Sequence, residues 1–358
     1  MENKKDKLKE LKKFWGGKKV FLTGHTGFKG SWMCVLLSIL GAKVIGYSLS
    51  PSKNGLFFKG KIHKLNHKNI YKNILNYKSL YKTIRLNKPD LLIHMAAQPL
   101  VKYSYENPEL TFNTNTVGTL NVLSSIKKTN SIKSSIIITT DKVYKNNSKS
   151  NHSENDELAG YDPYSSSKVC AEIVSETYKN CYLKNSKSSI STARSGNVIG
   201  GGDFSKDRLI PDIFRVIKTK KILKIRMPKA VRPWQHVIEP LVGYLFLLEK
   251  QYKNKKKFDN LGYGWNFGPN KENLVSVIKI VKYFKKIYKF NLKIKKKDFI
   301  ETNILKLNNN KSRRYLGWQP KWNLNKTLEK ILEWEDLKNR KINLTKICEK
   351  QILSYFYK

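Results

Sequence analysis

The sequence predicts an α/β fold, in which a doubly wound parallel sheet is followed by a smaller C-terminal α/β domain. Three observations lead to this prediction. Short apolar strands alternate with helix-length segments over about the first 195 residues, and a glycine-rich turn separates the first strand from the first helix. Beyond residue 195, loops and clusters of Trp and Pro replace the alternation. Alternating strands and helices are typical of parallel sheets, whose ligands bind outside the carboxyl ends of the strands.

Each element of the sheet has its own pattern. Lys19–Thr23 is expected to be a buried strand, and an apolar helix that Gly41 ends follows the glycine-rich turn. The expected elements, in chain order, are the strand Lys19–Thr23, the helix Ser31–Leu40, the strands Lys43–Tyr47 and Asp90–Met95, the helix Thr111–Lys127, the strand Ser134–Thr140, the helix Tyr164–Tyr182 and the strand Ser189–Arg194. We therefore expect a lysine-rich lead over 1–14, the sheet domain over 15–195, a second domain over 196–340 that is partly interleaved with the first, and a basic tail or helix over 341–358.

The composition is strongly basic. The 358 residues include 70 Lys and Arg against 27 Asp and Glu, for a formal charge of +43. Such a charge suggests nucleic acid or an anionic membrane. Only nine of the basic residues are Arg, however, and the lysines are spread along the whole chain. We therefore expect solvated lysine faces, with no nucleic-acid or membrane partner, and a field that attracts an anionic substrate.

The cysteines and the N-terminus indicate the compartment. Cys34, Cys170, Cys181 and Cys348 lie far apart, so neither a metal site nor a disulfide framework is indicated. Free thiols fit a reducing cytoplasm. The charged N-terminal segment has no apolar stretch behind it and is not expected to be a signal peptide.

The glycine-rich turn, TGHTGFKG over 23–30, predicts a dinucleotide site of the Rossmann type. Gly24 permits a tight turn, Gly27 lets the backbone approach a pyrophosphate, and Gly30 allows the helix to pack closely on the sheet. The amino end of the following helix then faces the phosphates. Because glycines also form plain turns, the prediction depends on the strand before the motif and the helix after it.

Two further motifs carry chemistry. Tyr164 and Lys168 are four residues apart and share one helix face, where an ammonium would lower the pKa of the phenol and make it a usable base. Thr140, Asp141 and Lys142 end a predicted strand and should point into the ligand crevice. A Thr suffices to hydrogen-bond a reacting hydroxyl; the added Asp and Lys supply an acid and a second base. The alternative for this Asp–Lys pair is a turn with a surface ion pair.

These motifs resemble the extended short-chain dehydrogenase/reductases and, within them, the sugar-nucleotide 4,6-dehydratases. Those enzymes carry Thr-Asp-Glu at this strand end, and the CDP-glucose branch resembles the Thr-Asp-Lys found here. Similar stretches are FWGGKKVFLTGHTGFKGSW (14–32), HMAAQPLVKYSY (94–105), GYDPYSSSK (160–168), RSGNVIGGGDFSKDRLIPDI (194–213), RPWQHV (232–237), WNFGP (265–269) and LGWQPKWNL (316–324). The resemblance spans about residues 14–335.

The resemblance implies NAD as cofactor and CDP-glucose as substrate. The second strand ends in Tyr-Ser-Leu-Ser without the family's acidic residue, and no Arg replaces it, so NAD is expected over NADP. The residues expected to hold the cofactor are Gly24, Thr26, Gly27, Phe28, Gly30, Asn73, Ala96, Ala97, Tyr164 and Lys168. The residues expected to bind the substrate are Asn197, Arg208 and Arg232. His94, Trp234 and His236 are expected to be packing residues, and no metal is expected.

The resemblance also implies a catalytic scheme in which Tyr164, with Lys168 and Thr140, acts at carbon 4, Lys142 is the base at carbon 5 and Asp141 is the acid at the 6-hydroxyl. A homodimer through the helices Thr111–Lys127 and Tyr164–Tyr182 is expected, and a tetramer stays open. Three alternatives also stay open: another nucleotide-sugar 4,6-dehydratase, a 4-epimerase or simple dehydrogenase, and a basic nucleic-acid-associated protein with a Rossmann fold.

Overall fold

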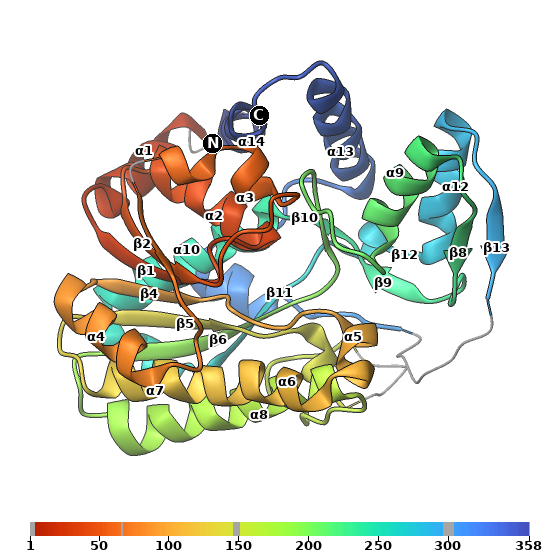
Figure 1. Ribbon diagram of the computed structural model, residues 1–358. Helices are drawn as coiled ribbons and strands as arrows, with labels where there is room; N and C mark the ends of the chain where they lie inside the picture. Colours follow the sequence, from red (N-terminus) through yellow and green to blue (C-terminus); the bar gives the residue numbers. More distant parts are fainter. Residues whose placement is uncertain (1–3, 66, 146–150, 296–303, 358) are drawn as a thin grey trace.

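A seven-stranded parallel sheet lies between two layers of helices in the computed structural model, which describes residues 4–65, 67–145, 151–295 and 304–357 (Figure 1). The strand order is β11-β6-β5-β4-β1-β2-β3. The chain runs outward from β1 to β3 and then returns to β4, so the winding reverses between β1 and β4; ligands bind at such a point. The strands are β1 (Lys19–Thr23), β2 (Lys43–Ser48), β3 (His67–Tyr71), β4 (Leu91–His94), β5 (Ser134–Ile138), β6 (Ser189–Ser195) and β11 (Gly264–Phe267).

Successive side chains of a strand point to opposite faces of the sheet. Because the central strands are buried at consecutive positions, both faces of the sheet carry an apolar core. Along β1, Val20 and Leu22 pack into one core, whereas Phe21 packs into the other. The first core is covered by α1 (Lys4–Trp15), α2 (Phe28–Ile39), α10 (Ile238–Lys253) and α14 (Leu344–Tyr357). The second is covered by α4 (Tyr77–Asn87), α7 (Gly118–Lys127) and α8 (Pro163–Tyr178). The structure thus confirms the predicted fold class.

The sequence analysis missed two edge strands of this sheet and the helices α4 and α10 that cover it. The strand β3 is half-exposed and mixes charged with apolar residues, so no burial pattern marks it. The strand β11 comes from residues 264–267, well beyond the predicted end of the alternation at residue 195, and pairs in parallel with β6. The helix α4, between β3 and β4, and the helix α10, before β11, were not assigned in the prediction. The predicted helix Thr111–Lys127 is a continuous helical stretch made of α6 (Pro108–Phe112), one wide turn (Asn113–Val117) and α7.

The two terminal segments are packed helices. In α1, Leu8, Leu11 and Trp15 are buried beneath the lysine-rich surface, and α14 packs against α1 and α2. Of the two alternatives for residues 341–358, a tail or a helix, the structure has the helix. Because α14 supports α2, it also supports the helix whose amino end faces the cavity described below.

The second domain has its own apolar core beside the carboxyl ends of the strands (Figure 1). Its elements are β8 (Leu223–Ile225), β9 (Val231–Pro233), β12 (Leu274–Ser276), β13 (Leu292–Ile294), α9 (Leu209–Thr219), α12 (Val277–Ile287) and α13 (Leu324–Asn339). The remaining short elements are α3 (Leu56–Lys59), α5 (Val101–Glu106), β7 (Val198–Ile199), β10 (Gln235–His236) and α11 (Lys255–Asn260). Among the residues described, none of the helices has the length and apolar character of a membrane span.

Candidate active site

A cavity of about 770 Å³ lies at the carboxyl ends of the strands and extends to the second domain. Its walls come from the loops after β1, β2, β4, β5 and β6 and from α9, β8 and β9. Every site residue predicted from the sequence lines it: Gly24, Thr26, Gly27, Phe28, Gly30, Asn73, Ala96, Ala97, Thr140, Asp141, Lys142, Tyr164, Lys168, Asn197, Arg208 and Arg232. The fold therefore brings together residues that are up to 208 positions apart (24 to 232).

The glycine-rich turn needs glycine at two of its positions. Gly24 has φ +72°, and a Cβ on it would lie 2.6 Å from the backbone nitrogen of Ala96. A Cβ on Gly30 would lie 2.1 Å from the carbonyl oxygen of Gly24. The turn consequently folds tightly against the end of β4, and the amino end of α2 is open to the cavity. A cradle of backbone N–H groups at a helix amino end fits the diphosphate of a dinucleotide.

The outer end of this cradle is polar but uncharged. Thr26 Oγ1 lies 2.8 Å from Ser48 Oγ at the end of β2, where a carboxylate is absent. Asn73 is exposed, and its side-chain oxygen accepts a hydrogen bond of 2.9 Å from the nitrogen of Leu75. The side-chain amide nitrogen of Asn73 is therefore the atom that could donate a hydrogen bond to a nucleoside.

The strand β5 is followed by a one-turn 3-10 helix, Asp141–Val143, that carries the predicted acid. Thr140 donates to Asp141 Oδ1 over 3.1 Å, while Oδ2 is buried with no hydrogen-bond partner among the described residues. Burial raises the pKa of Asp141 above its ordinary value, although Lys142 and Thr140 oppose the rise. A carboxyl group held toward its protonated form can donate a proton into the cavity. Lys142 itself is half-buried and lines the cavity.

Tyr164 and Lys168 project from the first two turns of α8. The helix begins at Pro163 under a capping box, in which Asp162 accepts from the nitrogen of Ser165 over 2.9 Å. Burial raises the pKa of Tyr164 to about 12, although a side-chain hydrogen bond with Thr140 and the charge of Arg208 oppose the rise. Burial lowers the pKa of Lys168 to about 8, and its Nζ donates to the carbonyl oxygen of Ile138 over 2.9 Å.

The expectation of a lowered phenol pKa is therefore wrong. Desolvation of Tyr164 outweighs the attraction of the neighbouring cations, because a buried phenolate loses its hydration. The Lys168 ammonium is turned toward the backbone of β5. Arg208, from the second domain, is the cation that most opposes the rise. The charge balance at Tyr164 thus depends on a residue of the second domain.

Lys29 is a cavity residue that the sequence analysis missed. Its Nζ lies 3.1 Å from Ser195 Oγ, which in turn accepts a hydrogen bond of 2.9 Å from the hydroxyl of Tyr244. Burial lowers the pKa of Lys29 to about 7, and the charges of Arg208 and Lys168 add to the effect. A lysine in the first turn of a helix opposes the helix dipole, and this unfavourable placement is the sequence signal that could have identified it.

The second domain supplies the basic wall of the cavity. Arg208 Nη1 lies 3.2 Å from Asp203 Oδ2, and its side chain is 31% exposed. Arg232, on β9, is buried, and its Nη1 donates to the carbonyl oxygen of Val231 over 3.1 Å. Asn197 lies in the loop after β6. Two guanidinium groups on one wall can form forked hydrogen bonds to phosphate.

Three aromatic or histidine side chains were expected to pack. His94 is buried, with Nδ1 2.7 Å from Thr23 Oγ1 and Nε2 3.1 Å from Thr119 Oγ1, and His236 is enclosed between aromatic rings, so both are confirmed as packing residues. Trp234 donates to the carbonyl oxygen of Val275 but also lines the cavity. In the described part of the chain, no three His, Cys, Asp or Glu side chains are gathered as metal ligands.

Comparison with known proteins places this arrangement among sugar-nucleotide enzymes. Residues 21–331 match the family model described as GDP-mannose 4,6 dehydratase. Over 353 residues the chain is 40% identical to the CDP-glucose 4,6-dehydratase of Salmonella typhimurium, with 96% of this chain and 97% of that protein covered. It is 28% identical to the UDP-glucose 4-epimerase of Mycoplasma pneumoniae, with 75% and 82% covered.

Solved structures share the fold. The dTDP-glucose 4,6-dehydratase of Bacillus anthracis, in complex with NAD, superposes with a TM-score of 0.76 at 23% identity and covers 91% of this chain and 98% of its own. An epimerase of Methanothermobacter thermautotrophicus reaches a TM-score of 0.80 at 21% identity, with 93% and 96% covered. At these identities the likeness shows the fold alone.

Proposed function

This chain belongs to the sugar-nucleotide 4,6-dehydratases of the NAD-dependent epimerase/dehydratase family, and we propose that it converts CDP-glucose to CDP-4-keto-6-deoxyglucose. One observation carries the proposal furthest. The turn Thr140–Lys142 and the pair of Tyr164 and Lys168 line the same cavity, so an acid and an additional amine stand beside the usual catalytic pair. Simple hydride transfer at one carbon requires only Thr, Tyr and Lys; a loss of water requires the acid and the second base as well.

NAD fits the inner half of the cavity. The cradle formed by Gly24, Gly27 and the amino end of α2 would hold the diphosphate, and Ala96 and Ala97 would lie along the cofactor. The uncharged end of β2 offers no cation for a 2′-phosphate, which favours NAD over NADP. When bound, NAD supplies the oxidant at carbon 4 and the reductant at carbon 6.

The residues of this chain then move protons at defined atoms. Tyr164 accepts the proton of the 4-hydroxyl while Thr140 holds that hydroxyl and Lys168 stabilises the phenolate. A ketone at carbon 4 makes the hydrogen at carbon 5 acidic. Lys142 accepts that proton and returns it to carbon 5 when carbon 6 is reduced, and Asp141 donates one to the departing 6-hydroxyl, which leaves as water. The raised pKa of Asp141 supports its role as the acid.

A direct assay tests the proposed function. The purified protein is incubated with NAD and, separately, with CDP-, dTDP-, UDP- and GDP-glucose, and the products are identified by mass and NMR. We expect a 4-keto-6-deoxy sugar from CDP-glucose at the highest kcat/KM. A product from another nucleotide sugar alone would replace the substrate, and inversion at carbon 4 without loss of water would replace the dehydratase with a 4-epimerase.

Arg232→Ala is expected to raise KM for the nucleotide sugar by about tenfold or more, with a smaller change in kcat. A charge-assisted contact with a diphosphate stabilises the bound ground state and transition state alike, so its loss appears in KM. Steady-state kinetics measures the effect. Arg340→Ala, which removes an exposed Arg that follows the last residue of α13 and pairs with Asp336, is the control for the loss of one charge. A loss in kcat at unchanged KM would contradict the assignment.

We infer a homodimer through the helices α6, α7 and α8, which form the outer layer on one side of the sheet (Figure 1). Large apolar side chains are exposed on these helices and on the wide turns after α6 and α8: Leu110, Val117, Leu120, Ile173 and Tyr182. Of the residues that the sequence analysis considered for this face, Ile173 is exposed, whereas Val169 and Tyr178 are packed within the protomer. An exposed apolar surface of this kind fits a contact with a second copy of the chain.

Light scattering across protein concentration and ionic strength tests the dimer. We expect a mass of two chains of 41.6 kDa at moderate salt and weaker association at low salt, because two strongly basic chains repel each other. Ile173→Glu should produce monomers, since Ile173 is 54% exposed at this face. Ile287→Glu, at a residue that is 49% exposed on α12 of the second domain, should leave the dimer intact. A monomer at every salt concentration would refute the proposal.

We also infer that the protein acts in the cytoplasm. All four cysteines are free: Cys34 and Cys348 are buried, Cys170 is half-buried and Cys181 is exposed. An exposed thiol and the absence of disulfides among the described residues fit a reducing compartment. Fractionation of cells that produce the protein would test the location.

A further inference from the structure

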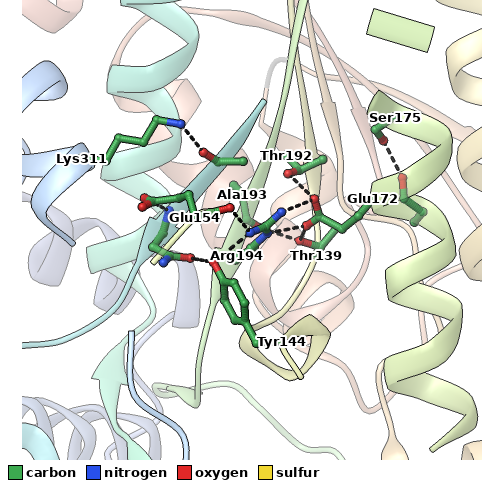
Figure 2. Close-up of polar contacts among 12 residues, drawn as sticks. Thr139, Tyr144, Glu154, Glu172, Ser175, Thr192, Ala193, Arg194 and Lys311 are labelled. Atoms are coloured by element: carbon green, nitrogen blue, oxygen red, sulfur yellow. Dashed lines mark hydrogen bonds and ion pairs between the residues drawn. The ribbon is translucent and has the colours of Figure 1, made fainter. Parts of the chain in front are cut away.

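A buried ion pair lies directly behind the catalytic turn. Glu172 is on α8, four residues after Lys168, and Arg194 is on β6; their side chains are 0% and 1% exposed. Arg194 donates through Nε to Glu172 Oε1 and through Nη2 to Oε2, each over 2.9 Å, in a forked arrangement (Figure 2). Burying two charges costs free energy, and such a pair persists only with good geometry and further hydrogen bonds.

Those hydrogen bonds connect the pair to both ends of the catalytic turn. Thr139, the residue before Thr140, donates to Glu172 Oε1 over 2.5 Å. Tyr144, the residue after the turn, accepts from Arg194 Nη1 over 2.8 Å (Figure 2). Its hydroxyl then donates to Asn266 Oδ1 on β11 over 2.7 Å. The segment that carries Thr140, Asp141 and Lys142 is thus held at its entry by the carboxylate and at its exit by the guanidinium.

The same pair fixes the catalytic helix against the sheet. Thr192, on β6, donates to Glu172 Oε2 over 2.6 Å, so each carboxylate oxygen accepts two hydrogen bonds. One turn earlier on α8, Lys168 donates to the carbonyl oxygen of Ile138. From these contacts we propose that Glu172 and Arg194 are positioning residues that clamp the turn Thr140–Val143 and the helix α8 into one catalytic unit. This proposal rests on the function proposed above.

The charge of Glu172 also acts on Lys168. Burial alone would raise the pKa of Glu172, but Arg194, Thr139 and Thr192 bring it below its ordinary value, so the group is a carboxylate. That charge opposes the burial that lowers the pKa of Lys168 to about 8. The other groups around Lys168 are Lys29 on α2, His94 on β4, Asp141 after β5, Arg194 on β6 and Tyr164 on α8. Burial lowers the pKa of His94 to about 3 and raises that of Asp141, so neither replaces the charge of Glu172.

Two isosteric variants separate positioning from stability. Thr139→Val and Thr192→Val each remove one hydroxyl bonded to Glu172, but only Thr139 adjoins the catalytic turn. We expect similar falls in Tm for both. We expect kcat to fall by about tenfold or more in Thr139→Val and by about threefold or less in Thr192→Val, because small displacements of reacting groups are costly. Tyr144→Phe, at the other end of the turn, should behave like Thr139→Val. Equal losses of kcat in the two Thr variants would overturn the proposal.

The pH dependence of NAD affinity, measured without a sugar nucleotide, provides a readout besides turnover. If the Lys168 ammonium contacts NAD, affinity is lost as the pH rises through the pKa of that lysine. Glu172→Gln should move this loss to lower pH by about one unit, whereas Thr192→Val should leave it in place. An unmoved profile in a folded Glu172→Gln variant would contradict the clamp. A wild type that turns over none of the sugar nucleotides would refute the proposed function. The NAD titration would still show whether Glu172 acts on Lys168, because it needs no sugar nucleotide.

Discussion

Replacing Tyr164 by phenylalanine is expected to lower the rate of product formation by about a thousandfold, with no reduced cofactor formed on the enzyme. The phenol is the only group proposed to accept the proton of the 4-hydroxyl, and loss of a general base typically costs two to four orders of magnitude, about 10²–10⁴-fold. The variant should fold, because the cap of α8 comes from Asp162 and Ser165. Rapid-mixing absorbance of the reduced nicotinamide, followed by product analysis, measures both effects.

The control for Tyr164→Phe is Tyr161→Phe, three residues earlier and 47% exposed. It removes an identical hydroxyl outside the cavity lining and should retain wild-type rates. Rapid formation of reduced cofactor in Tyr164→Phe would show that another group accepts the proton. Lys29 would be the first candidate, because burial lowers its pKa to about 7 and part of it is neutral at physiological pH.

Replacing Lys142 by alanine is expected to stop the reaction after oxidation at carbon 4 and before the loss of water. Oxidation at carbon 4 uses Tyr164, Lys168 and Thr140, which are untouched, whereas loss of water needs the base at carbon 5. The reduced cofactor should therefore accumulate on the enzyme after mixing with CDP-glucose, while release of 4-keto-6-deoxy product falls by about a hundredfold or more. The same rapid-mixing experiment distinguishes this outcome from that of Tyr164→Phe.

Lys145→Ala is the matched control for Lys142→Ala. Lys145 lies three residues further on, is exposed and pairs with Glu157 at the surface. Its loss should affect neither stage. Normal product release by Lys142→Ala would show that its amine is not the base at carbon 5. Loss of oxidation together with elimination would show that Lys142 contributes to substrate placement instead.

The features that could be predicted from the sequence are those formed by residues close together in the chain. The glycine turn and β1 lie next to each other in the chain, and Tyr164 and Lys168 share one helix, so spacing alone relates them. Edge strands are different. In β3, none of the five residues is fully buried. The strand β11 pairs with β6 across 72 positions of the chain (192 to 264). No periodicity within either strand reveals its neighbour.

The clamp shows a second limit. Glu172 follows Lys168 by four residues, a spacing that on most helices indicates an exposed ion pair of little consequence. Its partner is instead Arg194, on a strand on the far side of a loop, and both are buried. The raised pKa of Tyr164 was missed for the same reason, since it reflects desolvation by residues distant in the chain. Chemistry that depends on burial is visible only once the packing is known.

The edge strand β11 is synthesised about 70 residues after its neighbour β6. Until residues 264–267 have been made, β6 has no neighbour on its outer side, and its backbone groups are a template for pairing with other chains. A nascent or truncated protein that stops near residue 195 would carry a nearly complete nucleotide-binding sheet in which β6 is an unpaired edge strand. We expect such fragments to aggregate. We expect folding of the full chain to depend on rapid pairing of β11 with β6, or on a chaperone that covers the edge of β6 until then.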